Sequence, residues 1–388
     1  MKVLNFGGAD VRLWSAKLDE ESRRILARLS RCEHIAAPLA VMPDVHASSN
    51  VCVGTVLVTE SVVLPTAVGE DLGCGMYCAR LNLDAQAFSR AHLQQLVGLL
   101  HDRVPAGRRT HSRPMSLPAE VSSPLSVRTL EHQRQWLGAR HIGTLGGGNH
   151  FIELQRDGAG QMWLSVHSGS RGIGGAIASH HARAGHCWAS QQWHTSRVLP
   201  SIRLDSTQAE AFWHDYAWAF EFARCNRRAM ADAVCDVLSR FTNERIERSD
   251  ELDVPHNLIT REVVCGRSMV VHRKGAMPAH AGQRGLIPGS MGTASYIVEG
   301  LGNPLSYESC SHGAGRVMSR KEAHARITLE RLRRELRDVV FLEDAQLTRA
   351  LIEECPSAYK DIKEVLAQQA DLVRPIQRLE PMAVVKGK

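Results

Sequence analysis

The sequence predicts an α+β protein that folds as a single compact domain. Short runs rich in β-branched residues, bounded by glycine or proline, predict strands, and longer segments with apolar residues at helical spacing predict helices. No linker divides the 388 residues, and residue types that bind metals recur from position 71 to position 312. One domain spanning residues 1–388 is the simplest arrangement that brings those side chains together.

Four segments are predicted to be strands because they combine β-branched residues with glycine or proline punctuation. They are residues 50–58, 61–68, 160–167 and 262–272. Several Gly-rich motifs follow directly after such a run, at the place where functional loops are commonly built.

A long helix is predicted from Thr207 to about residue 240, because Thr207 and Glu210 have the spacing of a capping box. Asn226 lies on its apolar stripe, so the amide must find partners inside the protein. Two alternatives stay open for it: support of a functional site, or binding of a buried backbone group. The apolar stripe consists of Phe212, Tyr216, Ala219, Ala223, Met230, Val234 and Val237.

Two more helices are predicted near the C-terminus. Ser319 and Glu322 form a second capping-box pattern, and the helix that they open carries Glu330 and Arg334 at i,i+4 spacing. A third helix is expected after Pro356.

The stretch 104–127 contains four prolines and several serines and is predicted to be a long, mobile surface loop. Residues 102–140 around it hold seven arginines against three acidic residues. This basic stretch is either a nucleic-acid-facing arm or an ordinary solvated loop, and the sequence does not decide between them.

Composition excludes several classes of protein. Hydrophobic and charged contents of 44% and 23% are typical of a soluble globular protein, and no run of 18 apolar residues predicts a membrane span. The N-terminus lacks a signal-peptide pattern, so a cytoplasmic location is expected. Ten cysteines without a CxxC motif are expected to be reduced thiols, and a net charge of +6 permits a polyanionic partner without requiring one.

Six segments, most of them rich in glycine, together concentrate Asp, Cys and His. Imidazole, thiolate and carboxylate are the groups that bind transition metals, and neighbouring glycines let backbone N–H groups approach a phosphate. The sequence therefore predicts an enzyme with a metal centre and a phosphate-bearing substrate. The segments are VGEDLGCGM (68–76), GTLGGGNHFIEL (143–154), VHSGSRGIGG (166–175), PHNLITRE (255–262), PGSMGTASY (288–296) and SCSHGAGRVMSR (309–320).

Single members of this group carry little weight alone. Cys74 by itself would be a small buried hydrophobic residue, but Asp71, which two residues separate from it in a glycine turn, makes a metal-binding pair more reasonable. His150, His167 and His256 could each be an ordinary core histidine, so the prediction depends on the whole set. Four other histidines outside these segments are expected to be ordinary surface residues: His180, His181, His186 and His194.

Two common nucleotide-binding signatures are absent from the sequence. There is no G-x4-G-K-[ST] motif, and the glycines at positions 169, 172 and 174 occur in the wrong order for a dinucleotide fingerprint. A nucleotide is therefore expected to be bound by other loops.

From VMPDVH (41–46) to VVKGK (384–388), the chain resembles the RtcB family of GTP- and manganese-dependent RNA-splicing ligases. GTLGGGNHFIEL, HSGSRGIG, VHRKGA, PGSMGTASY and SCSHGAGRVMSR occur in order, and a chance agreement of five such strings is negligible. The resemblance implies β-sheets that surround a metal and nucleotide pocket, with flanking helices.

The resemblance also implies two Mn²⁺ ions per subunit. Asp71, Cys74 and His150 would hold one ion, and Cys74, His167 and His256 the other, with the thiolate shared between them. His312 would attack the α-phosphate of GTP and carry GMP. Asp44 is expected beside the metals, and two arginines are expected to act as phosphate clamps: Arg171 and Arg316.

GTP is the co-substrate that the resemblance implies. The residues expected to contact it are Asn149, His150, Phe151, Ile152, Glu153, His256, Asn257, Pro288, Gly289, Ser290, Met291, Ser295, His312, Gly313, Ala314, Gly315 and Lys386.

The implied reaction opens an RNA 2′,3′-cyclic phosphate to a 3′-phosphate, transfers GMP to it from His312, and joins the activated end to a 5′-hydroxyl. The expected partners are RNA with these ends and GTP. The enzyme is expected to be a monomer that does not associate with a membrane. The sequence departs from the family at Ala47-Ser48-Ser49-Asn50, where a turn with Gly and Lys is usual. Two alternatives are a phosphoesterase that only opens cyclic phosphates and a non-catalytic RNA-end-binding protein.

Overall fold

Two large sheets dominate a computed structural model, which describes residues 1–184 and 199–387. The first sheet has six strands in the order β1-β2-β3-β4-β12-β11, and all neighbours pair antiparallel except β2 and β3. Its strands are β1 (Lys2–Leu4), β2 (Val11–Leu13), β3 (Leu39–His46), β4 (Val53–Thr59), β11 (Asn257–Val264) and β12 (Arg267–Lys274).

The second sheet has seven antiparallel strands in the order β10-β6-β8-β7-β17-β15-β14. The chain passes from this sheet to the first one at His256, between β10 and β11. Its strands are β6 (Gly75–Asp84), β7 (Phe151–Arg156), β8 (Gln161–Ser168), β10 (Arg248–Pro255), β14 (Arg284–Ile287), β15 (Ser295–Gly300) and β17 (Val373–Lys386). Two small sheets pair β5 (Val62–Val63) with β9 (Ile202–Arg203), and β13 (Ala276–Pro278) with β16 (Ser309–Ser311).

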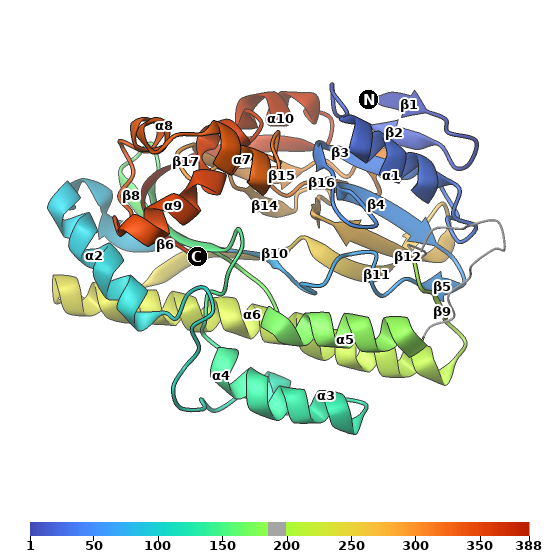
Figure 1. The fold of residues 1–388 in the computed structure, drawn as a ribbon, viewed down its shortest axis with the longest axis horizontal. Helices are drawn as coiled ribbons and strands as arrows, with labels where there is room; N and C mark the ends of the chain where they lie inside the picture. The colour runs from blue at the N-terminus through green and yellow to red at the C-terminus, as the bar shows by residue number, and fades with distance from the viewer. Residues whose placement is uncertain (185–198, 388) are drawn as a thin grey trace.

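Helices cover the sheets on opposite sides (Figure 1). The long α6 runs beneath them with α5 beside it, and α7 to α10 lie above them. The helices are α1 (Glu20–Ser30), α2 (Arg90–Arg103), α3 (Arg128–Gln133), α4 (Ala139–His141), α5 (Arg171–Ala184), α6 (Thr207–Thr242), α7 (Arg320–Arg326), α8 (Leu329–Glu335), α9 (Ala345–Ala350) and α10 (Ile362–Gln368). The predicted α+β class and single compact domain are confirmed, and no helix of the described residues is long and apolar enough to cross a membrane.

Two strand predictions need correction. The run 262–272 is a hairpin rather than one strand, because Cys265 and Gly266 both have positive φ (50° and 78°) and turn the chain between β11 and β12. Such a two-residue turn matches the twist of antiparallel strands. Of residues 61–68 only Val62 and Val63 pair, because Pro65 cannot donate a hydrogen bond to a sheet.

The helix starts also differ in detail from the prediction. Ser206, not Thr207, caps α6, because its hydroxyl accepts a hydrogen bond from the N–H of Ala209 (3.2 Å). The capping box of Ser319 and Glu322 forms as predicted. The helix then ends at Arg326, however, and Thr328 caps α8.

This break changes the predicted ion pair. In α8 Arg331 pairs with Glu335 at 2.7 Å, one position after the predicted pair of Glu330 and Arg334. The helix predicted after Pro356 is α10, which begins at Ile362 after the cap residue Asp361.

His181 was predicted to be a surface residue, and this prediction is wrong, because its side chain is buried and the residue is only 3% exposed. Its Nε2 lies 2.8 Å from Oδ2 of Asp215, which also accepts hydrogen bonds from the backbone and hydroxyl of Ser126. His180 is partly buried, and His186 and His194 lie outside the described residues.

Candidate metal and nucleotide site

Four strands of the second sheet bring predicted metal ligands to one edge. Because the pairing is antiparallel, β6 and β7 begin where β8 and β10 end. Cys74 precedes β6, His150 precedes β7, His167 is the second-last residue of β8, and His256 follows β10. The register alone therefore places these side chains together.

Cys74 lies at the centre of this cluster. Its Sγ is 3.5 Å from Nε2 of His150 and 3.4 Å from Nε2 of His167. The Nε2 atoms of His167 and His256 are 3.3 Å apart, and Nε2 of His150 is 3.1 Å from Oδ2 of Asp71. Cys74 thus stands between one Asp–His pair and one His–His pair.

Backbone groups orient two of these rings. The Nδ1–H of His150 donates to the carbonyl of Leu145 at 2.9 Å, and that of His167 donates to the carbonyl of Asn149 at 3.3 Å. Each bond leaves the Nε2 lone pair directed at the cluster, as in metal sites where a second hydrogen bond sets the tautomer.

The Asp71 carboxylate packs against Gly169, where no larger residue would fit. A Cβ atom at Gly169 would lie only 2.3 Å from Oδ1 of Asp71. The carboxylate therefore occupies space that any other residue at 169 would fill.

Burial and mutual repulsion set the protonation of the cluster. Burial, followed by the charges of neighbouring histidines, holds the pKa of His167 and His256 well below the usual range, so both rings are neutral. Burial would raise the pKa of Asp71, but the hydrogen bond and charge of His150 leave it below its ordinary value. Burial and the Asp71 charge raise the pKa of Cys74, and a bound dication would reverse that effect.

The donor set fits transition-metal ions. The ligand atoms of Cys74, His150 and His167 all lie within 4.8 Å of one another, and all three residues are buried. One thiol, neutral imidazoles and an adjacent carboxylate are borderline-soft donors, which suit such ions and not Mg²⁺ or Ca²⁺.

Helix α6 supports this cluster through two residues. The buried guanidinium of Arg227 donates to the carbonyl of Gly73 at 2.8 Å and to that of Ser168 at 3.0 Å, and it pairs with Asp253 at 2.6 Å. These carbonyls adjoin Cys74 and His167. The sequence analysis did not identify Arg227 as a residue of the site. The feature that could have indicated it is its position directly after Asn226 on the predicted helix.

Asn226 satisfies both alternatives considered for it. Its amide exchanges hydrogen bonds of 3.1 Å with the backbone of Thr144, and it donates at 3.2 Å to Ser168 Oγ and to the carbonyl of Gly169. It therefore binds buried backbone groups that belong to the site.

His312 lies next to the cluster, on the turn after β16. Its ring centroid is 4.7 Å from that of His256. The Nδ1–H of His312 donates to Oδ2 of Asp44 at 2.6 Å, which leaves Nε2 unprotonated. Asp44, which was expected beside the metals, is completely buried, and its carboxylate accepts this hydrogen bond from His312.

The turn after His312 is shaped by Gly315. Its φ of +73° is in the left-handed region, and a Cβ there would lie 2.2 Å from the carbonyl of Asp44. Lys360 holds the same part of β3 by donating to the carbonyls of Pro43 and Val45, each at 2.7 Å.

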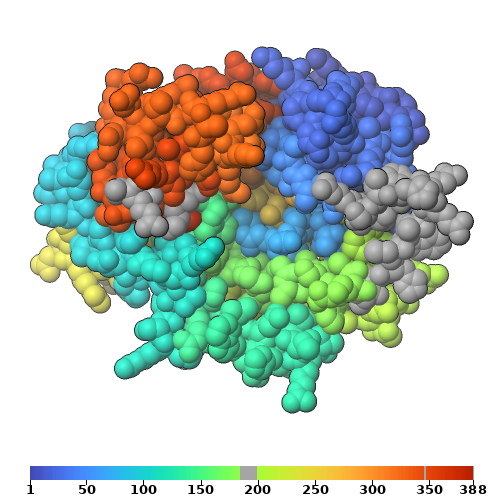
Figure 2. Space-filling model, in the orientation of Figure 1, coloured from blue at the N-terminus to red at the C-terminus, as the bar shows by residue number. Residues whose placement is uncertain are grey.

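A cavity of about 1090 Å³ opens beside His312. Figure 2 shows the recess on the surface, between the blue N-terminal and orange C-terminal segments. Of the residues predicted to contact GTP, those lining the cavity are Asn149, His150, Phe151, Glu153, His256, Asn257, Pro288, Gly289, Ser290, Met291, His312, Gly313, Ala314, Gly315 and Lys386. Ile152 and Ser295 do not line it.

Glu153 is a buried carboxyl in the cavity wall. Burial raises its pKa to about 8, against the opposing charge of Lys386. The amide of Gln155 donates to Glu153 at 2.6 Å and to Ser295 Oγ at 2.9 Å. Ser295 therefore acts behind Glu153 rather than in the cavity.

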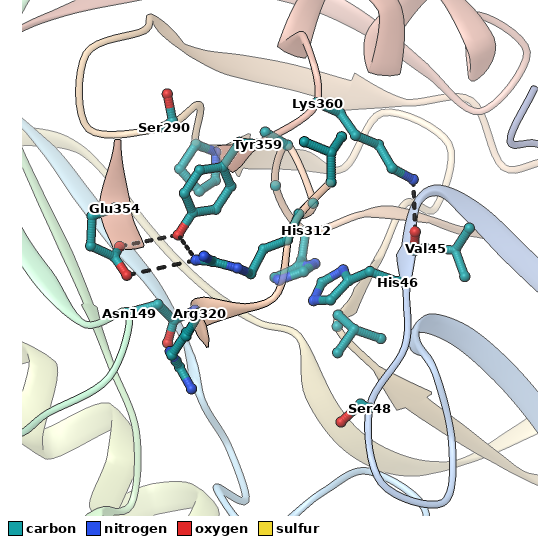
Figure 3. A pocket seen from close by; sticks show the side chains of 18 of the residues that line it. Val45, His46, Ser48, Asn149, Ser290, His312, Arg320, Glu354, Tyr359 and Lys360 are labelled. Carbon is teal, nitrogen blue, oxygen red and sulfur yellow. Dashed lines mark hydrogen bonds and ion pairs between the residues drawn. The ribbon is translucent and has the colours of Figure 1, made fainter. Parts of the chain in front are cut away.

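Glu354 links two cations of the cavity wall and was not identified from the sequence. Figure 3 shows its carboxylate facing the hydroxyl of Tyr359. Its carboxylate lies 2.6 Å from Nζ of Lys386 and 3.9 Å from the guanidinium of Arg316, and it accepts a hydrogen bond from the Tyr359 hydroxyl at 3.1 Å. Arg316 also donates to that hydroxyl at 2.9 Å. No local pattern marks Glu354, because its partners come from three separate segments.

Arg171 and the turn 47–50 lie at different borders of the site. Arg171 does not line the cavity; its Nε donates to Thr144 Oγ1 at 3.2 Å, near the Asp71 charge. At the turn, Lys274 donates to Ser48 Oγ at 3.1 Å and to the carbonyl of Val51 at 2.7 Å. A lysine from β12 thus supplies a cation where the sequence predicted that one is lost.

The chain is similar over most of its length to known RNA-splicing ligases. A family model described as "tRNA-splicing ligase RtcB" matches residues 25–387. The chain is 37% identical to the RNA-splicing ligase RtcB of Escherichia coli (strain K12), over 100% of this chain and 99% of the relative. It is 31% identical to the RNA-splicing ligase RtcB of Mycobacterium tuberculosis (89% and 96%) and 30% identical to the tRNA-splicing ligase RtcB of Thermococcus kodakarensis (89% and 87%).

Proposed function

The chain belongs to the RtcB family of RNA-splicing ligases, and on this basis we propose that it joins RNA 2′,3′-cyclic-phosphate or 3′-phosphate ends to 5′-hydroxyl ends with GTP as co-substrate. The observation that carries the proposal is the Asp44–His312 hydrogen bond of 2.6 Å beside a Cys/His cluster in one cavity. A nucleophile, its orienting carboxylate and a metal-binding set are then within reach of one phosphate.

In the first step, the Nε2 lone pair of His312 attacks the α-phosphorus of GTP. A P–N bond forms, the P–O bond to pyrophosphate breaks, and Asp44 stabilises the positive charge that develops on the ring through its hydrogen bond to Nδ1–H. Glu153, Lys386 and Phe151 line the cavity and would bind the nucleoside part.

The second step moves GMP to the RNA. Water first opens a cyclic phosphate to a 3′-phosphate, and an oxygen of that phosphate attacks the guanylate phosphorus and releases His312. The 5′-hydroxyl of the second RNA then attacks the RNA 3′-phosphorus, displaces GMP and forms a 3′,5′ phosphodiester. Positioning and charge neutralisation dominate such phosphoryl transfers, and Arg316 in the cavity wall is placed for both.

We propose two Mn²⁺ ions at the cluster, one held by Asp71, Cys74 and His150 and the other by Cys74, His167 and His256. A bound dication would supply Lewis-acid charge for the phosphate oxygens. The usual affinity order favours zinc or cobalt over manganese at such donors. We propose manganese nevertheless, on the basis of family membership and of the metal supply in the cell.

Incubation with radiolabelled GTP and Mn²⁺ tests the nucleophile. We expect labelled wild-type protein and no label in His312→Ala, while His280→Ala, a surface histidine paired with Glu308, labels normally. Unlabelled wild type, or equal labelling of His312→Ala, would refute the assignment. Opening of cyclic phosphates without any joined product in the presence of GTP would identify a phosphoesterase instead.

Cys74→Ala tests the shared thiolate. Because one sulfur contacts both halves of the cluster, we expect the variant to lose both metal ions. Metal analysis of purified protein, with Cys310→Ala as a buried-thiol control, measures this. Two ions retained in Cys74→Ala would contradict the bridge.

A further inference from the structure

A basic arm adjoins the site and takes no part in the chemistry described above. The arm consists of residues 105–142, which include α3 and α4. It holds six arginines and two glutamates, a net charge of +4 in a chain whose total is +6. In Figure 2 this segment, drawn in teal, lies on the same face as the recess.

Most of the arm's arginines lack a carboxylate partner among the described residues. Glu131 is neutralised by Arg134 at 2.7 Å. Arg109 and Arg140 donate only to other groups, including the carbonyls of His101 (2.7 Å) and Ser112 (3.0 Å). Within residues 1–184 and 199–387, three further arginines form no ion pair: Arg108, Arg113 and Arg128. All three are exposed.

The outer side of the arm also exposes large apolar side chains. Trp136 is 61% exposed and Met115 is 48% exposed. A tryptophan so exposed is uncommon, because Trp is highly buried on average. Exposed arginines and an exposed aromatic ring in one segment are the side chains that bind single-stranded nucleic acid, since every base has a face that stacks.

The inner side of the arm is firmly attached, so this surface exists before any partner binds. Val121, Leu125 and Leu130 are buried against α5 and α6. The indole of Trp218 donates to the carbonyl of Val121 at 3.0 Å, and the backbone of Ser126 donates to Asp215 at 2.7 Å.

The arm is continuous with the wall of the catalytic cavity. The N–H of Gly107 donates to the carbonyl of Gly146, and the N–H of Leu145 donates to that of Pro105, both at 2.9 Å. The carbonyl of Leu145 in turn orients His150. The arm is therefore attached to the loop that leads to His150, a residue that lines the cavity.

We propose that the outer surface of the arm binds unpaired nucleotides of the RNA next to the end being joined. Arg108 and Arg113, both exposed, would contact backbone phosphates, and Trp136 would stack on a base. This inference rests on the proposed RNA-joining function and adds to it the place where the body of the RNA is bound.

Binding of a fluorescent RNA of about a dozen nucleotides with a 3′-phosphate, measured by anisotropy without GTP, tests the arm. Loss of one stacked base should raise Kd about fivefold to a hundredfold in Trp136→Ala, and Trp136→Phe should recover most of the affinity. The Arg108→Ala/Arg113→Ala double variant should lower the slope of log Kd against log salt by about 1.4. A two-nucleotide substrate, too short to reach the arm, should be joined equally well by all variants.

Two controls separate this inference from the proposed function. Arg245→Ala removes an arginine that is 89% exposed outside the arm and should bind RNA like wild type. Labelling by GTP needs no RNA and should be unchanged in every arm variant. If wild type is labelled but Trp136→Ala and the double variant bind long RNA like wild type, the arm proposal is wrong, and a protein partner becomes the occupant to test.

Discussion

At the scale of single residues, the proposed chemistry depends on which nitrogen of each histidine faces the cavity. His150 and His167 donate their Nδ1–H to backbone carbonyls, and His312 donates its Nδ1–H to Asp44. In each ring the Nε2 lone pair is consequently available. The same arrangement would serve both proposed roles, which are metal binding by His150 and His167 and nucleophilic attack by His312.

Asp44→Asn tests the carboxylate behind His312. An asparagine amide can donate to Nδ1 and so favour the wrong tautomer, and it cannot stabilise the imidazolium. We expect the rate of guanylylation by GTP to fall about 10³- to 10⁴-fold, as when the aspartate of a catalytic triad is replaced. Metal content should stay at the wild-type level, and wild-type labelling by Asp44→Asn would contradict this role.

Glu153 predicts a pH dependence of stability. Its pKa is about 8 in the folded protein, against an ordinary value of 4.5, because burial penalises the carboxylate. The unfolded chain therefore ionises first, and the contribution of Glu153 to stability, complete below pH 4.5, is lost as the pH rises to about 8.

Glu153→Gln should remove this loss. The variant should gain stability relative to wild type by at most ~1.4 kcal/mol per pH unit within that window and by nothing more above it. Urea unfolding at several pH values measures the difference. Glu380→Gln, at an exposed ion pair, is the control, and parallel curves for Glu153→Gln and wild type would show that the buried carboxyl is not protonated.

At the scale of elements, α6 acts as the support of the site. Asn226 and Arg227 are consecutive residues on its buried side, and together they bind the backbone at Thr144, Gly73 and Ser168. Two loops and the end of β8, which carry candidate metal ligands, are thus attached to one helix. Preorganisation of this kind keeps ligands in place when no ion is bound.

Arg227→Met tests this support. The substitution leaves Asp253 as an unpaired, largely buried carboxylate and frees two carbonyls, so we expect a loss of about 3–5 kcal/mol of unfolding free energy. Metal affinity should fall as well, because the Cys74 loop loses its attachment. Arg224→Met on the exposed side of α6 should change little, since its partner Glu221 is on the surface. Equal unfolding curves for the two variants would refute the role of Arg227.

At the scale of the whole molecule, strand order rather than chain order builds the site. The chain passes from the second sheet to the first at His256. Asp44 lies in the first sheet, and the strands of the second sheet carry Cys74, His150 and His167 at or next to their ends. The last strand, β17, returns through the middle of the second sheet and places Lys386 opposite Phe151. Both ends of the chain therefore contribute to one cavity.

RNA affinity should depend strongly on salt, because residues 105–142 carry a net charge of +4 in a chain whose total is +6. Each phosphate contact releases counterions, so log Kd should rise linearly with log salt, by about 0.7 for each phosphate bound on a single strand. Anisotropy titrations between low and physiological salt measure this slope. Affinity that does not change with salt would exclude a backbone-binding surface.

Much of the fold could be predicted from local patterns. The periodic stripe of α6 and the Ser319 cap follow from interactions within a few residues, and these predictions are confirmed. The errors also have local causes. The turn at Cys265 and Gly266 lies within a segment that was predicted to be a single strand. Thr328 caps a new helix, α8, within a segment that was predicted to be one continuous helix.

The chemical groups of the candidate site could be read from the sequence, because Asp, Cys and His next to glycines indicate tight turns that can hold a metal or a phosphate. The residues that support these groups became visible only in the folded chain. Asp44 binds His312 from 268 residues away, Arg227 binds Gly73 from 154 residues away, and Glu354 joins Lys386 to Arg316. Such contacts depend on sheet register and on packing between distant segments, which no local spacing of residues encodes.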